Sequence, residues 1–283
     1  MAQLEGRVAL ITGASRGIGR AIARRFAAEG AAVVLSASRM GRHGNLEGSL
    51  EESVDGIQAQ GGRAAAEACD LGDAVARADL VARAERHFGP VDIVVNNAAV
   101  SRMRLPSECT LEERTRMFDV NVNAPVDLAQ QALPGMRQRR RGWILNISSA
   151  TSQQPVVPYR DSQMAAHIIA AYGASKAALD RYTEGLAHEV AADEVFVNTL
   201  APQSIVLTAG ADYVRDIARR NPDMVEPVET MAEAALALCS GRHVGQICFS
   251  RAFLLAIAQG VRSLDGKALL GDAFIAADPE STA

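Results

Sequence analysis

"RVALITGASRGIGR", residues 7–20, joins a strand pattern to a helix pattern through three glycines. The β-branched run before the glycines is typical of a short buried strand, and the residues after them begin an amphipathic helix. Glycine lets the chain turn tightly and approach a pyrophosphate closely, and the N-terminus of the helix offers free N–H groups to an anion. This stretch therefore predicts the phosphate-binding turn of a dinucleotide-binding fold, and we call residues 13–19 the glycine loop.

The rest of the chain repeats the same alternation of strand and helix. Strands are expected over 7–12, 31–37, 91–96, 142–148 and 195–201, and helices over 19–30 and 76–89. This rhythm predicts an α/β fold, a single-domain Rossmann-type doubly wound parallel sheet with helices on both faces. No repeat or linker divides the chain, so residues 1–283 are expected to form one dinucleotide-binding and catalytic domain. Two segments, 40–50 and 150–168, interrupt the rhythm.

Composition excludes several classes of function. The net charge of −4 gives no electrostatic case for nucleic acid or an acidic membrane surface. The four cysteines and five histidines show no ligand spacing, so no metal site is expected, and free thiols indicate a reducing compartment. The N-terminal apolar run is too short for a signal peptide or a membrane span. A soluble, cytoplasmic protein is expected.

The end of the second predicted strand distinguishes between nicotinamide cofactors. An acidic residue there would bind the ribose 2′-OH of NAD, whereas arginine accommodates the 2′-phosphate of NADP. The sequence has Ala37, Ser38 and Arg39 and no acid, and Arg16 of the glycine loop can reach the same place. NADP(H) is therefore preferred. NAD(H) is the alternative, in which Arg39 is simply solvated and the following segment rearranges the pocket.

"YGASK", residues 172–176, places a tyrosine and a lysine four residues apart. On a helix such residues share one face, with Cβ atoms about 5–6 Å apart. A nearby ammonium favours the phenolate, which would bring Tyr172 toward the pH range where proton transfer is efficient. The alternative is that Tyr172 and Lys176 merely decorate a helix surface.

Six motifs in order resemble the classical short-chain dehydrogenase/reductase family over about the first 210 residues. They are "TGASRGIG" from Thr12, "CDLGD" with Asp70, "NNAA" at 96–99, "VNVNAP" with Asn121, "NISS" at 146–149 and "YGASK". The resemblance implies an oxidoreductase that interconverts an alcohol and a carbonyl by hydride transfer with a nicotinamide cofactor.

The resemblance also implies a role for each catalytic residue. Tyr172 matches the general acid/base that protonates or deprotonates the substrate oxygen. Lys176 matches the residue that holds the ribose hydroxyls and lowers the tyrosine pKa. Ser149, rather than Ser148, matches the polar partner of the substrate oxygen, and Asn121 is similar to the asparagine that kinks its helix and carries a water of the proton relay.

Further matches concern the cofactor. Asp70 resembles the residue that contacts adenine, with Leu71 alongside, while Asn97 and Ala98 match the stretch lining the adenosine ribose. Ile205 lies where the family's backbone binds the nicotinamide carboxamide. The complete expected cofactor set is Gly13, Ser15, Arg16, Gly17, Ile18, Gly19, Ser38, Arg39, Asp70, Leu71, Asn97, Ala98, Tyr172, Lys176, Ile205 and Thr208.

The chain departs from the family pattern on the substrate side. The spacing from Ser149 to Tyr172 is about ten residues longer than usual, so 150–168 contains an insertion. Tyr159 lies nearer the usual spacing but has no lysine four residues later, which favours Tyr172. We expect the insertion to border the substrate pocket; the alternative is a solvent-exposed excursion.

Two more departures lie near the C-terminus. "PQ" at 202–203 replaces the usual Pro-Gly, and an apolar continuation over 250–283 replaces the usual glycine-rich ending. This variant extension is expected to cover the pocket or a subunit contact. Family resemblance implies a homo-oligomer, a tetramer or dimer, that uses the helices around 110–135 and 172–191.

A hydrophobic ketone, a steroid-like compound or an acyl compound is the expected substrate, because the pocket-side segments are apolar. Two alternatives stay open. One is an NAD-linked secondary-alcohol dehydrogenase, and the other is a weakly catalytic NADP(H)-binding regulatory protein.

Overall fold

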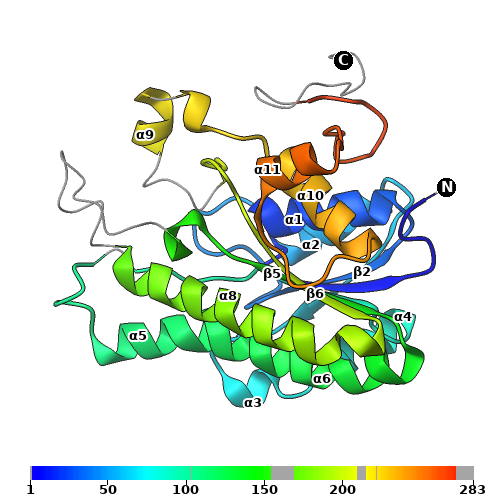
Figure 1. Ribbon diagram of the computed structural model, residues 1–283, viewed down its shortest axis with the longest axis horizontal. Helices are drawn as coiled ribbons and strands as arrows, with labels where there is room; N and C mark the ends of the chain where they lie inside the picture. The colour runs from blue at the N-terminus through cyan, green and yellow to red at the C-terminus, as the bar shows by residue number, and fades with distance from the viewer. Residues whose placement is uncertain (1, 103, 154–168, 209–214, 221, 272–283) are drawn as a thin grey trace.

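The computed structural model describes residues 2–102, 104–153, 169–208, 215–220 and 222–271. The described part of the chain contains one seven-stranded parallel sheet in the order β3-β2-β1-β4-β5-β6-β7 (Figure 1). The strands are β1 Val8–Thr12, β2 Ala32–Ala37, β3 Arg63–Ala68, β4 Ile93–Asn96, β5 Gly142–Ile147, β6 Val195–Ala201 and β7 Ile247–Phe249. The predicted doubly wound α/β fold is confirmed.

The order of the strands reverses at β1, which pairs with β2 on one side and β4 on the other. Ligands of open α/β sheets bind at such a switch point, outside the carboxyl ends of the strands. The chain leaves β1 and β4 at this edge through the glycine loop and through the segment that begins at Asn97. The fold therefore places the glycine loop and Asn97 at this edge.

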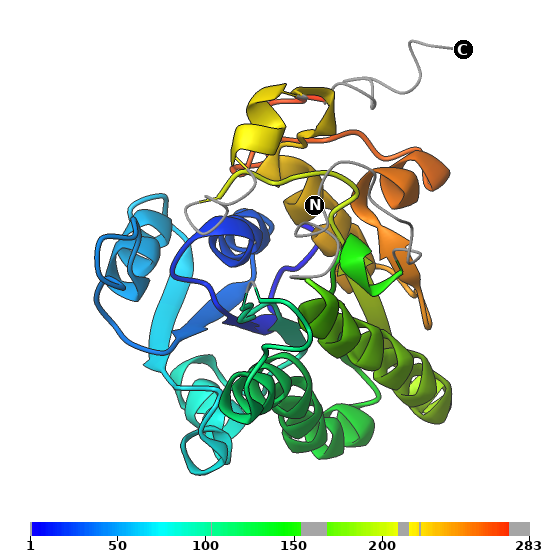
Figure 2. The ribbon, with the colours of Figure 1, turned by 90° about the vertical axis from the view of Figure 1, so that its left-hand side faces the viewer.

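Two layers of helices cover the sheet, one on each face (Figure 2). Side chains of β1 alternate between the layers: Ala9 and Ile11 join one apolar cluster, and Val8 and Leu10 join the other. The first layer contains α1 Gly17–Ala28, α2 Leu50–Gln58, α10 Val228–Ser240 and α11 Ser250–Ala256. The second contains α3 Ala74–Arg77, α4 Leu80–Phe88, α5 Leu111–Phe118, α6 Ala124–Arg139 and α8 Ala170–Val190.

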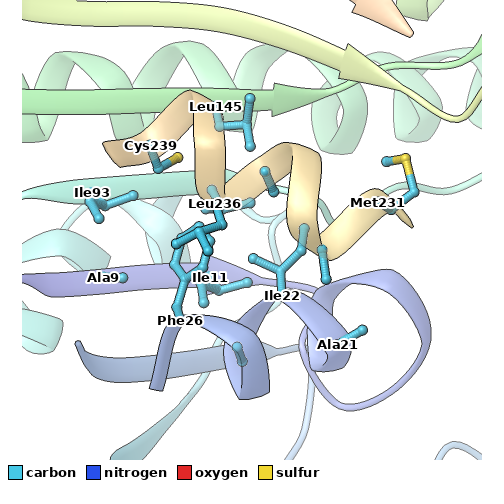
Figure 3. Close-up of a cluster of buried hydrophobic side chains, with 14 of the residues drawn as sticks. Ala9, Ile11, Ala21, Ile22, Phe26, Ile93, Leu145, Met231, Leu236 and Cys239 are labelled. Carbon is cyan, nitrogen blue, oxygen red and sulfur yellow. The ribbon is translucent and has the colours of Figure 1, made fainter. Parts of the chain in front are cut away.

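The core of the first layer lies between α1, α10 and the sheet (Figure 3). Ile22 and Phe26 of α1 pack with Leu236 of α10 against Ile11 of β1, and all four side chains are almost completely buried. Each large apolar side chain of this kind contributes roughly 1.5–3 kcal/mol to folding. This core fixes the direction of α1, and with it the turn that precedes the helix.

Short elements complete the fold. They are the π-helical turn Asp119–Asn123 between α5 and α6, the 3-10 turns Ala150–Ser152, Ala191–Asp193 and Pro222–Met224, and helix α9 Arg215–Arg220. The predicted helix over 76–89 is divided into α3 and α4, because the backbone leaves helical geometry at Asp79. No helix in these ranges is long and apolar enough to cross a membrane.

Candidate active site

Backbone conformation and close contacts require glycine at three positions of the loop after β1. Gly13 and Gly17 adopt φ values of +64° and +57°, which side chains rarely tolerate. A Cβ on Gly13 would lie 2.8 Å from the Cα of Ala98, and one on Gly19 would lie 2.6 Å from the carbonyl oxygen of Gly13. The loop therefore turns tightly into α1 and keeps backbone open to a ligand, as a pyrophosphate cradle requires.

Asn97 ties this loop to the end of β4. Its Nδ2 donates to the carbonyl oxygens of Thr12 and Gly13 at 2.9 and 3.1 Å. The backbone N–H groups of Asn97 and Ala98 donate to Thr12 Oγ1 at 3.0 and 3.1 Å. The Asn97 side chain thus holds the loop in shape, and half-buried Ala98 lies directly beside Gly13.

The residues expected at the 2′-phosphate fit an anion. Ser38 and Arg39 are exposed directly after β2, and neither Arg39 nor Arg16 has an ion-pair partner among the described residues. Arg16 lies at the N-terminus of α1, and its Nη1 is buried without a hydrogen-bond partner in the described part of the chain. A buried guanidinium donor without a partner is unfavourable unless an acceptor arrives. A phosphate oxygen would supply that acceptor.

Asp70, the expected adenine contact, already has partners within the protein. Its Oδ1 accepts from Arg116 Nη2 at 2.6 Å and from the N–H of Gly72 at 3.0 Å. Burial would raise the pKa of Asp70, but these hydrogen bonds and the Arg116 charge outweigh it and lower the pKa. A Cβ on Gly72 would overlap the guanidinium of Arg116. Arg116 was missed by sequence reasoning, because it lies 46 residues from its partner.

Helix α8 holds the tyrosine and lysine together. Lys176 is 1% exposed, its Nζ donates to the carbonyl oxygen of Ile147 at 2.6 Å, and Nζ lies 5.8 Å from the ring centre of half-buried Tyr172. Burial lowers the pKa of Lys176 to about 8, with a partial offset from the negative charge of Asp180 one turn later. Lys176 is therefore buried beside Tyr172 and does not lie on the surface of the helix.

Asn121 lies in the π-helical turn, completely buried. Its amide exchanges two 2.9 Å hydrogen bonds with the backbone of Val100, and its Nδ2 also donates to Ser175 Oγ at 3.0 Å. Ser175 Oγ in turn donates to the carbonyl oxygen of Tyr172 at 2.7 Å. A π-helical turn interrupts an α-helix and often marks a functional position. Asn121 and Ser175 together position the start of α8, and Ser175 was not predicted.

Ser149 begins the turn that follows β5. Its half-buried Oγ accepts from the N–H and the hydroxyl of Thr151 at 3.3 and 3.0 Å. This turn packs closely on α8 beside Tyr172. A Cβ added to Gly173 would lie only 2.7 Å from the carbonyl oxygen of Thr151. Ser148 is buried, and its hydroxyl makes no hydrogen bond of ordinary geometry within the described residues.

The loop after β6 brings the last two predicted residues to the site. Ile205 forms a parallel bridge with Val225: its N–H donates to Met224 O at 2.7 Å, and its carbonyl accepts from the N–H of Glu226 at 2.9 Å. Thr208 reaches the glycine loop, since a Cβ on Gly17 would lie 3.2 Å from the Cβ of Thr208. The N–H of Ile205 is therefore already engaged within the protein.

A buried polar cluster, the C-terminal clasp of Ser204, Glu226, Ser250 and Arg251, holds this loop. Arg251 Nη1 donates to Ser204 Oγ at 2.7 Å and Nη2 donates to Val225 O at 2.8 Å. The hydroxyl of Ser250 lies 2.8 and 2.9 Å from the carboxylate oxygens of Glu226. Glu226, Ser250 and Arg251 are at most 2% exposed. The clasp stands where the family pattern has Pro-Gly and a glycine-rich ending.

Known proteins are similar to this chain in sequence and in fold. The family profile of short chain dehydrogenases matches residues 7–217. The chain belongs to the short-chain dehydrogenase/reductase family. A short chain dehydrogenase of Pseudocercospora fijiensis is 34% identical over 87% of this chain and 75% of its own length. A gluconate 5-dehydrogenase of Gluconobacter oxydans is also 34% identical, over 84% of this chain and 89% of its own.

A solved structure extends the comparison to three dimensions. The NADP-bound 3-oxoacyl (acyl-carrier-protein) reductase from Agrobacterium tumefaciens is 34% identical with a TM-score of 0.72, covering 87% of this chain and 93% of its own. The chain is thus an NAD(P)-dependent short-chain dehydrogenase/reductase. Its relatives at equal identity differ in substrate, so family membership does not select one.

The predicted insertion and extension are only partly described in this short-chain dehydrogenase/reductase. Residues 150–153 form the turn that begins at Ser149 and end at exposed Gln153, while Tyr159 and the rest of 154–168 lie outside the described residues. The described part of the extension begins with α11 and ends at residue 271, and residues 272–283 lie outside the described residues. Within the described ranges no group of three or more His, Cys, Asp or Glu side chains is arranged to hold a metal ion.

Proposed function

We propose that this chain is an NADP(H)-dependent oxidoreductase that interconverts an alcohol and a carbonyl, on a hydrophobic ketone, steroid-like or acyl substrate. The observation that carries the proposal is the buried Lys176, whose ammonium lies 5.8 Å from the ring centre of Tyr172. A buried lysine beside a tyrosine, at the carboxyl edge of a parallel sheet, is an arrangement for proton transfer.

Tyr172 acts as the general acid in reduction and as the general base in oxidation. Its phenol gives a proton to the substrate oxygen, or takes one from it, while the cofactor, when bound, supplies or accepts the hydride. The positive charge of Lys176 favours the phenolate left after reduction. Ser149 binds the same substrate oxygen and orients it toward the phenol.

Lys176 has a second task in this proposal. An ammonium has three N–H donors, and the described residues use one of them for Ile147. Two donors are left for the ribose hydroxyls next to the nicotinamide. Asn121 holds the first turn of α8 through Ser175 and carries the water that returns a proton toward Tyr172.

NADP(H) is preferred over NAD(H) because the end of β2 presents Ser38 and Arg39 and no carboxylate. Nη1 of Arg16 is also buried, without a hydrogen-bond partner among the described residues. Gly13, Ser15, Gly17, Ile18 and Gly19 would hold the pyrophosphate. The remaining expected contacts are Asp70 and Leu71 for adenine, Asn97 and Ala98 for the ribose, and Ile205 and Thr208 for the nicotinamide end. For the N–H of Ile205 to bind the nicotinamide end, its hydrogen bond to the carbonyl oxygen of Met224 must break.

Consumption of NADPH and NADH by the purified protein, against a mixed panel of hydrophobic ketones, tests this function. Turnover that requires NADPH and disappears in Tyr172→Phe supports it. One observation favours a second function, NADP(H) binding with little catalysis for the regulation of a partner: the N–H of Ile205 is engaged by Met224. Tight NADPH binding without turnover on any ketone would support that second function.

We also propose a cytoplasmic homo-oligomer. A groove of about 600 Å³ lies between α6 and α8 and is lined in part by Leu133, Pro134 and Tyr182. All four cysteines are free, which is typical of a reducing compartment and supports the proposed cytoplasmic location. Gly185 lines the groove and has open space around it, so Gly185→Arg should reduce the assembly to a smaller species without unfolding it. Light scattering of the two proteins distinguishes a dimer or tetramer from a monomer.

A further inference from the structure

The segment between β2 and α2 folds back over the glycine loop. Its ends meet where the N–H of Leu50 donates to Met40 O at 2.9 Å. Near its end, Gly48 adopts φ +95°, and a Cβ there would lie 2.5 Å from Ser15 O and 3.1 Å from the Cβ of Arg16. Only glycine permits this close approach. The residues of this segment are thus held beside Arg16 and are not extended into solvent.

Within this segment the ring of His43 turns toward the end of β2. Its Nε2 lies 3.1 Å from Ser38 Oγ, and its carbonyl accepts from the N–H of Leu46 at 3.0 Å to close a turn. Burial lowers the pKa of His43, and the positive charges of Arg39 and Arg16 lower it further. Both guanidinium groups therefore lie close enough to the imidazole to act on its charge.

Among the described residues, no acidic side chain forms an ion pair with Arg16, Arg39 or His43. Arg42, in the same segment, is bound by Glu52 of α2. Glu47 is exposed and forms no ion pair among the described residues. Arg16 and Arg39 are likewise without ion pairs there, and Nη1 of Arg16 is buried without a hydrogen bond. The imidazole beside Ser38 thus lies within electrostatic reach of two guanidinium groups, and none of these three groups is ion-paired to a carboxylate among the described residues.

We infer that His43 is a third cationic ligand of the 2′-phosphate of NADP(H), acting with Arg16 and Arg39. The inference rests on the proposed NADP preference and adds to it a residue that no motif pointed to. A phosphomonoester carries nearly two negative charges at neutral pH and three strong acceptor oxygens. Its charge reverses the electrostatic effect of the two arginines on the imidazole, so that the ring takes up a proton as the phosphate binds.

The sign of the resulting pH dependence follows from that proton. In the free protein, burial and then the neighbouring cations lower the pKa of His43, so the ring stays neutral to lower pH than usual. With the phosphate bound the charged ring is favoured, so the affinity for a 2′-phosphate rises as the pH falls through the pKa of the bound ring. The rise ends near pH 6, where the phosphate itself takes up a proton. A nucleotide without the 2′-phosphate has no such dependence.

Calorimetric binding of adenosine 2′,5′-bisphosphate tests the inference without turnover, with adenosine 5′-diphosphate as the control ligand. Wild-type protein, His43→Gln and His188→Gln are compared at pH values of about 6.5 and 8.5. His188 is an exposed histidine near the C-terminal end of α8, roughly 24 Å along the helix from Tyr172, and provides the matched substitution. Repeating the titrations in buffers of different ionisation enthalpy measures the protons taken up.

We expect the wild type and His188→Gln to bind the bisphosphate about five- to tenfold more tightly at the lower pH, with net proton uptake. His43→Gln should lose about fivefold in affinity at the lower pH, vary little with pH and take up fewer protons, while its affinity for the 5′-diphosphate stays unchanged. The unchanged control ligand would also show that the fold is intact.

Two results would overturn the inference, and they are distinguishable. A wild-type protein that binds both nucleotides equally well would refute the NADP preference, and the role of His43 with it. A wild-type protein that prefers the bisphosphate, together with a His43→Gln variant of the same affinity and pH dependence, would refute only the role of His43.

Discussion

Nζ of Lys176 donates a 2.6 Å hydrogen bond to the carbonyl oxygen of Ile147, the last residue of β5. The acceptor is neutral, and the buried ammonium forms no ion pair among the described residues, so that the charge of Asp180 offsets only part of its desolvation. This bond joins α8 to the sheet at the carboxyl edge where the cofactor is expected.

Tyr172→Phe should reduce kcat by about 10²–10⁴-fold, the usual contribution of a general acid or base. The affinity for NADPH should change by no more than about twofold, because the ring that packs near Lys176 is retained. Steady-state kinetics and cofactor fluorescence measure the two quantities. A variant that keeps its rate would transfer the role to another acid, with Tyr159 the first candidate.

The pH dependence of kcat/KM should show a decline above about pH 8 that belongs to Lys176. Burial lowers the pKa of this lysine to about 8, so the free enzyme loses the ammonium as the pH rises through that value. Arginine stays charged throughout this range. Lys176→Arg should therefore move the decline to higher pH even if its maximal rate is lower, and an unchanged profile would contradict the assignment.

The same lysine predicts how stability varies with pH. Its pKa in the folded protein, about 8, lies below the value of about 10.4 in an unfolded chain. Between these values the unfolded state binds more protons, so the contribution of Lys176 to the free energy of unfolding increases as the pH rises from 8 to 10. Urea denaturation at several pH values should show a smaller increase for Lys176→Met than for the wild type.

Asn97→Ala should lower the free energy of unfolding by about 1–3 kcal/mol, because the carbonyl groups of Thr12 and Gly13 lose their donor. Cofactor affinity should fall as well, since the same bonds shape the glycine loop. Asn123→Ala is the matched control: Asn123 is exposed, and within the described part of the chain its amide donates only to Asp119. Equal losses in the two variants would show that the loop does not depend on Asn97.

Ala37→Asp should move the preference for NADPH over NADH, as a ratio of kcat/KM values, by about tenfold toward NADH. A carboxylate at the end of β2 can bind the ribose 2′-OH and repels a 2′-phosphate. Ala37→Asn provides a side chain of similar size without the charge. If both variants keep the wild-type ratio, the 2′-phosphate is recognised elsewhere.

Local chemistry explains why much of the fold was predictable. The glycine loop and five of the seven strands described here were expected from their own residues, because glycine turns and β-branched runs specify them locally. β3 was not, since "RAAAEA" is alanine-rich and has strong helix propensity. Its strand conformation comes from pairing with β2 along Ala32 to Ala37, a tertiary effect that outweighs propensity.

The contacts between side chains were harder to predict from the sequence than the motifs were. The motifs indicated Asn121, Tyr172 and Lys176, and the structure brings these three residues to one end of α8. The sequence did not indicate Ser175, Arg116 or the clasp, because each depends on contacts between residues far apart in the chain. Arg251 and Ser204, for example, are 47 positions apart, and the pairing of β6 with β7 brings their segments together.

The C-terminal clasp also sets an order of events during synthesis of the chain. The strands from β1 to β5 and the residues around Lys176 emerge from the ribosome well before Arg251, which anchors the loop at Ser204. At a translation rate of about 5–20 residues per second, several seconds separate the emergence of Lys176 from that of α10, which packs on α1, and of Arg251, which anchors the loop. Both ends of the cofactor site are therefore completed only after Arg251 has been made.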